Sequence, residues 1–177
     1  MTNRQCATGI ATATRPGRAN GDPRGNAMCP ITASIARPAD PADPTSPRPD
    51  FSLTFPPDPG WVRTAREAIR AVLRTAGRSD LVDTALLLTS EVVTNAVTAC
   101  LSSGCVSPLK LHAAWSPTGA LHVLVRDDAP GLPVQRVPAG DAEHGRGLLL
   151  IGACAADWGI CRHGPGPGKA VWFELGD

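Results

Sequence analysis

The 177-residue sequence has no tyrosine, and aromatic residues make up only 4% of it, so its core must be mostly aliphatic. Its net charge is only +1, whereas a clustered basic face would be expected for a nucleic-acid-binding protein. It lacks the unbroken apolar run of about 18 residues needed to cross a bilayer. The N-terminus also lacks the apolar segment of a secretory signal. We therefore expect a cytoplasmic protein that binds neither nucleic acid nor membranes.

Six cysteines are present, but their spacing matches neither a zinc site nor a disulfide scaffold. We expect reduced thiols, as is usual for cytosolic proteins. The six are Cys6, Cys29, Cys100, Cys105, Cys154 and Cys161.

Residues 1–50 contain no leucine, valine or aromatic residue, and they hold eight of the 18 prolines. Such a segment cannot bury enough apolar surface to offset the entropy lost on ordering. We expect residues 1–50 to be a disordered, proline- and alanine-rich tail, with a docking tail as the alternative. The domain is then residues 51–177.

From Phe51 onward, apolar residues recur at strand or helix spacing between glycine- and proline-rich turns. Asp58 is the predicted cap of the first helix. The sum predicts an α+β two-layer sandwich, in which helices cover one face of a mostly antiparallel sheet. The predicted strands are 51–55, 109–115, 121–126, 157–162 and 170–175, and the predicted helices are 61–76, 80–101 and 145–156.

Glu91 and Asn95 are four residues apart on the second predicted helix, so their side chains lie on one face, a turn apart. The helix around them is strongly apolar, and a carboxylate and an amide there need partners. An oxygen-rich cation site would provide one, because Mg²⁺ takes few protein oxygens and retains phosphates and waters. The alternative is the exposed polar face of an amphipathic helix.

Asp127 follows a predicted strand and precedes Gly131, which would let the backbone approach a ligand. A carboxylate there can accept a hydrogen bond from an exocyclic amine such as that of adenine, although an ordinary Asp turn also fits. Gly145-Arg146-Gly147 precedes a helix, where free backbone N–H groups favour phosphate. The P-loop and Rossmann fingerprints are absent. Lys169 is interpreted as a surface-turn residue, with a position close to the nucleotide as the alternative.

Four segments in this order resemble the GHKL, or Bergerat-fold, ATPases. Within that family, residues 51–175 are most similar to short histidine-kinase-like ATP-binding proteins of actinobacteria, which are related to anti-sigma-factor serine kinases. The four segments are Ser90-Glu-Val-Val-Thr-Asn-Ala96, Val125-Arg-Asp-Asp-Ala-Pro-Gly-Leu-Pro133, Gly145-Arg-Gly-Leu-Leu-Leu150 and Gly168-Lys-Ala-Val-Trp-Phe-Glu-Leu175.

The resemblance implies ATP and Mg²⁺ as cofactors and assigns a role to each matching position. Asn95 would ligate Mg²⁺, and Glu91 would act as general base or orient the nucleophile. Asp127 would bind the adenine amine, and Gly131 would give adenine room. The remaining positions would contact or close over the phosphates, with residues 132–144 as a lid. These positions are Gly145, Arg146, Gly147 and Leu148.

Three positions depart from the family pattern. Ala129 replaces a usual glycine, and Ala170 replaces a usual threonine whose hydroxyl would lie near adenine. Thr98-Ala-Cys100 replaces a basic pair. Losing one hydrogen bond costs about 0.5–1.5 kcal/mol, so we expect weakened nucleotide binding.

The leading hypothesis is an anti-sigma-factor-type serine kinase that phosphorylates a small antagonist protein and binds a sigma factor. A homodimer is part of this hypothesis. The alternatives are a non-catalytic, ATP-dependent protein-binding module and a detached histidine-kinase catalytic domain. The last is the least favoured, because residues 1–50 contain no His-bearing helix pair.

Overall fold

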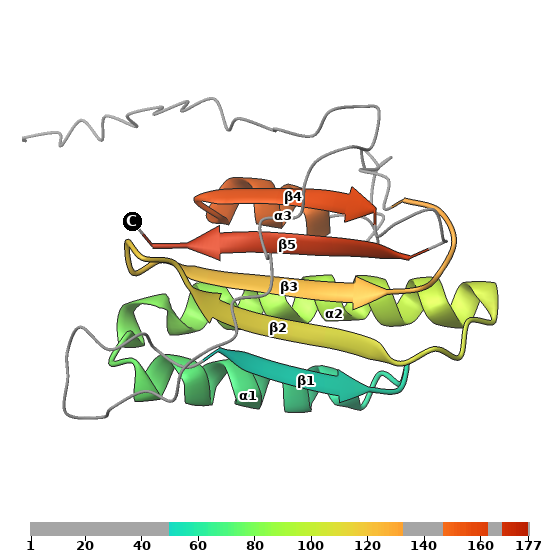
Figure 1. Cartoon of the computed structure of the whole chain (residues 1–177), viewed down its shortest axis with the longest axis horizontal. Coiled ribbons are helices and arrows are strands. Elements are labelled where there is room, and N and C mark those ends of the chain that lie inside the picture. The colour runs from blue at the N-terminus through green and yellow to red at the C-terminus, as the bar shows by residue number, and fades with distance from the viewer. Residues whose placement is uncertain (1–49, 133–146, 163–167, 177) are drawn as a thin grey trace, which may run out of the picture.

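The computed structural model describes residues 50–132, 147–162 and 168–176. They form two layers, a five-stranded sheet and three α-helices that all lie on one of its faces (Figure 1). This confirms the predicted α+β sandwich. The predicted tail, apart from Asp50, and most of the predicted lid lie outside the described residues.

The strand order is β1-β2-β3-β5-β4, and every pairing in this sheet is antiparallel. β3 is therefore the central strand, and β5 lies directly beside it. Each of these two strands is one residue longer than predicted. The strands are β1 (Phe51–Phe55), β2 (Leu109–Trp115), β3 (Leu121–Asp127), β4 (Asp157–Arg162) and β5 (Lys169–Leu175).

The helix α1 (Trp61–Thr75) buries one apolar stripe, and Gly77, with a φ of 69°, ends it by entering the left-handed region. Asp58 accepts a hydrogen bond from the Gly60 N–H at 2.7 Å, but the N-cap of the helix, the residue just before Trp61, is Gly60. The predicted Asp58 cap is therefore wrong, because the carboxylate closes a turn one step before the helix.

The helix α2 (Val82–Ser103) follows a short 3₁₀ turn, Ser79–Leu81, and ends at the left-handed Gly104. With that turn it is long and apolar enough to cross a membrane by length and composition alone. Core helices meet the same criterion, and most apolar residues of α2 pack into the core, where α2 lies between α1 and α3 against the sheet. The third helix, α3 (Gly147–Cys154), ends two residues before the predicted position.

The two faces of the sheet carry different residues, because side chains alternate along a strand. The helix-covered face contributes residues such as Val125, Val171 and Phe173 to the main core. On the other face Leu124, Ala170 and neighbouring residues form a second, small cluster. This division decides which residues of β3 and β5 can reach the predicted site.

Three of the cysteines have free thiols: Cys100, Cys105 and Cys154. Cys161 is disulfide-bonded. The expectation of reduced thiols is therefore confirmed for the first three and wrong for Cys161.

Candidate functional site

The side chains of Glu91 and Asn95 meet the first residue of α3. A methyl group placed on Gly147 would lie 2.7 Å from Glu91 Oε2 and 2.9 Å from Asn95 Nδ2. Both distances are shorter than any ordinary van der Waals contact, so this position has room only for glycine unless the two side chains move. The structure thus brings together three of the predicted site residues from two separate elements.

The geometry of this cluster suits an anion close to an oxygen-rich group. The first N–H groups of an α-helix have no partner within the helix, and a helix N-terminus favours negative charge. Gly147 is buried at this N-terminus, and Glu91 and Asn95 are half-buried. The cluster therefore combines hydrogen-bond donors at the start of α3 with the Glu91 carboxylate and the Asn95 amide of α2.

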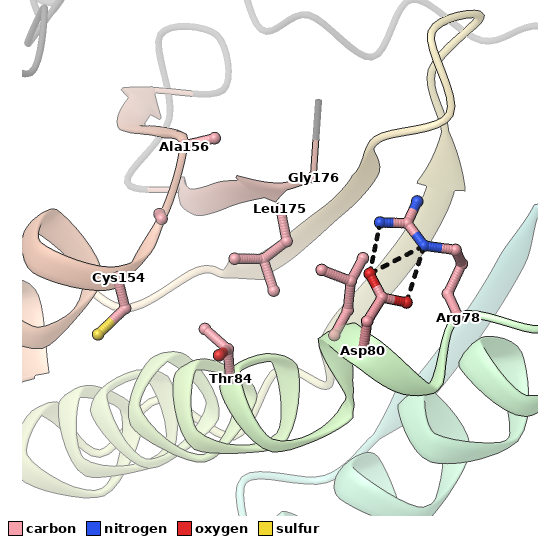
Figure 2. Close-up of a pocket in the computed structure, with 9 residues that line it drawn as sticks. Arg78, Asp80, Thr84, Cys154, Ala156, Leu175 and Gly176 are labelled. Atoms are coloured by element: carbon pink, nitrogen blue, oxygen red, sulfur yellow. Dashed lines mark hydrogen bonds and ion pairs between the residues drawn. The ribbon is translucent and has the colours of Figure 1, made fainter.

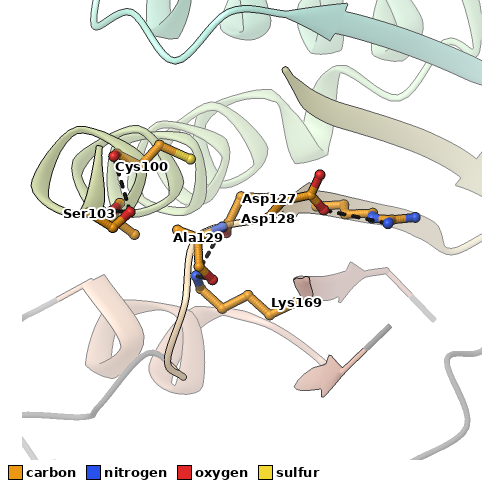
Figure 3. A network of polar contacts seen from close by, with 8 residues as sticks. Cys100, Ser103, Asp127, Asp128, Ala129 and Lys169 are labelled. Atoms are coloured by element: carbon orange, nitrogen blue, oxygen red, sulfur yellow. Dashed lines mark hydrogen bonds and ion pairs between the residues drawn. The ribbon is translucent and has the colours of Figure 1, made fainter. Parts of the chain in front are cut away.

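A second polar cluster lies at the adjoining ends of β3 and β5 (Figure 3). Asp127 Oδ1 accepts a hydrogen bond from the Ala129 N–H at 2.9 Å and another from Lys169 Nζ at 2.6 Å. Lys169 Nζ also donates to the Ala129 carbonyl at 3.0 Å. The two charged side chains are almost completely buried, with 2% of Asp127 and 5% of Lys169 exposed. They form a closed ion pair.

The protonation of Asp127 depends on this ion pair. Burial raises the pKa of the Asp127 carboxyl, while the Lys169 ammonium and the Ala129 N–H oppose that rise. The charged form of Asp127 is therefore maintained against burial largely by Lys169.

Lys169 contradicts the sequence-based interpretation, which placed it in a surface turn. It is the first residue of β5 and lies directly opposite Asp127 in the strand register. It shares its face with Val171 and Phe173, on the helix-covered side. Ala170 points to the other face and packs with Leu124. The expectation that Ala170 removes a hydroxyl from the adenine site is therefore wrong, because its side chain is on the wrong face.

The helix α2 links the two clusters. Cys100 is buried near the end of α2, and burial, followed by the nearby charge of Asp127, raises the pKa of its thiol to about 11. Asn95 lies five residues earlier, which is about 7.5 Å along a helix axis. At 3.6 residues per turn, Cys100 also lies about 140° around the helix axis from Asn95, so the two clusters approach α2 at different heights and from different sides.

The remaining predicted residues divide into three groups. Gly131 is exposed and has a φ of 82°, a conformation that favours glycine. The side chain of Leu148 is 5% exposed and packs in the core, so the group it can offer a ligand is its backbone N–H. Gly145 and Arg146 lie outside the described residues.

Magnesium fits the donors at the Glu91–Asn95 cluster. Among the described residues, no three His, Cys, Asp or Glu side chains gather as a metal cage. Mg²⁺ does not need one, since it is commonly held by one or two side-chain oxygens together with phosphates and waters. Asn95 can supply such an oxygen, with Glu91 beside it.

The structure also has a shallow pocket between the start of α2 and the end of β5 (Figure 2). Its lining includes Arg78 and Asp80, which form an ion pair at 2.9 Å, and Leu175. Lys169 and Leu175 are the two ends of β5, so this pocket lies at the end of the sheet remote from Asp127. It is separate from the predicted site.

Comparison with known proteins agrees with this fold. Residues 55–175 match the family model described as a histidine kinase-like ATPase domain. A structure of the RsbU and RsbW domains of Rv1364c from Mycobacterium tuberculosis is similar, with a TM-score of 0.54 and 21% sequence identity. The match covers 71% of this chain but 32% of that one, so the chain spans about a third of its length. No curated protein matches.

Proposed function

The chain belongs to the family of histidine kinase-like ATPase domains, and on that premise we propose that it is an ATP- and Mg²⁺-dependent protein serine kinase of the anti-sigma-factor type. The observation that carries the proposal is the cluster of Glu91, Asn95 and Gly147. It combines a carboxylate, a side-chain amide and a helix N-terminus, which are the groups that phosphoryl transfer needs for positioning and charge stabilisation.

In the proposed reaction, a serine hydroxyl oxygen of a protein substrate attacks the γ-phosphorus of ATP. A new O–P bond forms, the bond between the γ-phosphorus and the bridging oxygen breaks, and ADP leaves. Glu91 orients the serine and accepts its proton. The backbone N–H groups at the start of α3 bind phosphate oxygens. Asn95 would hold Mg²⁺, which would supply positive charge to offset the charge of the phosphates.

The proposed partners follow from the resemblance of residues 51–175 to anti-sigma-factor kinases. The substrate is a small antagonist protein with a target serine, and a sigma factor is bound in one nucleotide state. A homodimer and a cytoplasmic location are part of the same proposal. The structural match to an RsbW domain supports this choice through the fold it shares with the chain.

The proposal predicts that the protein binds ATP and ADP and that Mg²⁺ tightens the binding, as measured by calorimetry with and without the ion. Asn95→Ala should remove most of the Mg²⁺ effect. Thr94→Ala, one residue away and exposed, should preserve it. Absence of binding for both nucleotides at millimolar concentration with Mg²⁺ would overturn the proposal. Binding without any transfer to a panel of candidate antagonists would instead favour the non-catalytic module.

Gly147→Ala tests the cluster itself. The added methyl group would displace the ends of Glu91 and Asn95, and we expect Mg²⁺-dependent ATP affinity to fall about tenfold, the equivalent of one hydrogen bond. Stability should change little, because the displaced atoms are the ends of flexible side chains. Calorimetry and thermal unfolding measure the two effects.

The matched control is Gly152→Ala on the same helix. There a methyl group would meet Trp158 at 3.4 Å, an ordinary contact. This variant should bind ATP as the wild type does. If Gly147→Ala also leaves ATP affinity unchanged, the nucleotide phosphates do not bind at this cluster.

A further inference from the structure

The carboxylate of Asp127 uses one of its two oxygen atoms within the fold. Oδ1 accepts hydrogen bonds from the Ala129 N–H at 2.9 Å and from the Lys169 ammonium at 2.6 Å. None of the described residues donates a hydrogen bond to Oδ2, and Oδ2 is not one of the buried polar atoms left without a partner. Oδ2 is therefore an unused acceptor that still contacts solvent, although only 2% of the side chain is exposed.

Lys169 determines which of the two oxygens is unused. Its Nζ bridges Asp127 Oδ1 and the Ala129 carbonyl oxygen, which lies 3.0 Å away, and its backbone lies opposite Asp127 in the strand register. Ala129 is itself fully buried in the core. Rotating the carboxylate would break both hydrogen bonds to Oδ1, so the second oxygen is held in one direction.

Asp127 lies on the same side of the sheet as the proposed phosphate site. Residues directly opposite each other on paired strands share a face, and Lys169 shares its face with the core residues Val171 and Phe173, under the helices. The helix α2, which carries Glu91 and Asn95, covers this same face (Figure 1). A nucleotide with its phosphates at that cluster and its base at Asp127 would therefore use one face of the sheet.

Lys169 also favours the charged form of the carboxylate. Burial raises the pKa of the Asp127 carboxyl, and the hydrogen bond and charge of Lys169 are the largest effects that oppose the rise. The charge of Asp128 adds to the rise, while the Cys100 thiol of α2, whose pKa is about 11, is neutral near neutral pH. A charged carboxylate only accepts hydrogen bonds, whereas a protonated one also donates. Loss of Lys169 would therefore change both the direction and the hydrogen-bonding character of Oδ2.

We propose that Lys169 is a positioning residue for base recognition: it holds Asp127 Oδ1 and leaves Oδ2 as the acceptor for the exocyclic amine of adenine. The inference rests on the proposed function, since it concerns the nucleotide site. It deepens that function by making selection of the base depend on a buried lysine that acts through Asp127.

The first experiment compares the affinities of the wild-type protein for Mg²⁺-ATP and Mg²⁺-inosine triphosphate (ITP) by calorimetry. ITP carries a carbonyl oxygen where ATP carries the amine, so it would place an acceptor against Oδ2 and leave both oxygens unpaired. We expect ATP to bind at least about tenfold more tightly, the effect of one good hydrogen bond. Affinities that agree within about threefold would show that Oδ2 does not bind the amine, and they would overturn the inference.

The second experiment replaces the lysine by an uncharged side chain of similar volume. In Lys169→Met the Asp127 carboxyl loses its counter-charge and the donor that holds Oδ1, so it is protonated more readily as the pH falls. A protonated carboxyl can donate to the carbonyl of ITP. The ATP-to-ITP affinity ratio should therefore fall to about threefold or less, and it should decline further at lower pH. Lys110→Met, which replaces an exposed lysine of β2, is the matched control and should keep the wild-type ratio.

The ratio cancels effects that the two nucleotides share, such as protonation of their phosphates or a general loss of stability. A merely structural role for Lys169 would weaken both nucleotides alike. It would leave the ratio and its pH profile unchanged, and that result would overturn the inference.

A measurement on the wild type does not depend on whether Lys169→Met folds. In isotope-labelled protein, NMR can follow the Lys169 ammonium and the carboxyl carbon of Asp127. On addition of Mg²⁺-ATP we expect the ammonium to keep its chemical shift, because it stays bound to Oδ1. The carboxyl carbon should shift more with ATP than with ITP. Displacement of the ammonium by ATP would show that Lys169 does not position the carboxylate.

The outcomes separate the two proposals. If the wild type binds ATP and ITP equally, the nucleotide site stands and the role of Lys169 is wrong. If the wild type binds neither nucleotide, the proposed function fails, and this inference fails with it.

Discussion

Glu91→Gln is expected to lower the rate of phosphoryl transfer to a serine by about 10²- to 10⁴-fold, the usual contribution of a positioned general base. Glutamine has nearly the same shape, so the contact with Gly147 is retained, but its amide does not accept the serine proton. The measurement is transfer of labelled phosphate from ATP to an antagonist protein, with the phosphoserine located by mass spectrometry.

ATP affinity should stay within about threefold of wild type, because the lost function belongs to the transition state. Glu67→Gln is the matched control, since Glu67 is an exposed glutamate of α1 that pairs with Arg70. It should transfer phosphate normally. A Glu91→Gln protein that keeps the wild-type rate would exclude Glu91 as the base, whereas one that loses ATP binding would show a role in binding instead.

The sequence was sufficient to predict that Glu91 and Asn95 lie together on one face of α2. Both residues lie on a helix whose period is clear from its apolar residues, and their four-residue spacing places them on one face whatever the tertiary structure. Their contact with Gly147 depends on packing α3 against α2, which the sequence pattern does not contain. The family resemblance provided that link, and the close approach at Gly147 agrees with it.

The surroundings of Asp127 were predicted less well, because the sequence did not indicate the buried pair with Lys169. In β5 both alternating sets of residues are largely apolar, so the pattern did not show which set faces the helices. Lys169 follows a glycine- and proline-rich stretch of the sequence, and a lysine there is usually exposed. Its burial depends on a carboxylate 42 positions away in the chain. The available signal was the two-residue period of the strand, which places Lys169 on the same face as Val171 and Phe173.

Asp127→Asn is expected to destabilise the fold by about 3–5 kcal/mol, the usual cost of removing one partner from a buried ion pair. The asparagine oxygen can still accept the Ala129 N–H, but the Lys169 ammonium would lose its counter-charge while 5% exposed. Denaturant unfolding measures the loss. Asp128→Asn is the control, since the Asp128–Arg126 pair is about 39% and 37% exposed and such a pair contributes about 0–1 kcal/mol.

This prediction changes how loss of ATP binding in Asp127→Asn would be interpreted, because an unfolded protein also fails to bind. The double variant Asp127→Asn/Lys169→Met resolves the ambiguity. It removes both charges and retains the volume of the lysine, and replacing a buried pair by uncharged groups is often neutral in stability. We expect it to recover most of the free energy of unfolding that Asp127→Asn loses.

Recovery of stability without recovery of ATP binding would assign the carboxylate to the nucleotide. No recovery of stability would show that the cost of Asp127→Asn does not come from the unpaired ammonium.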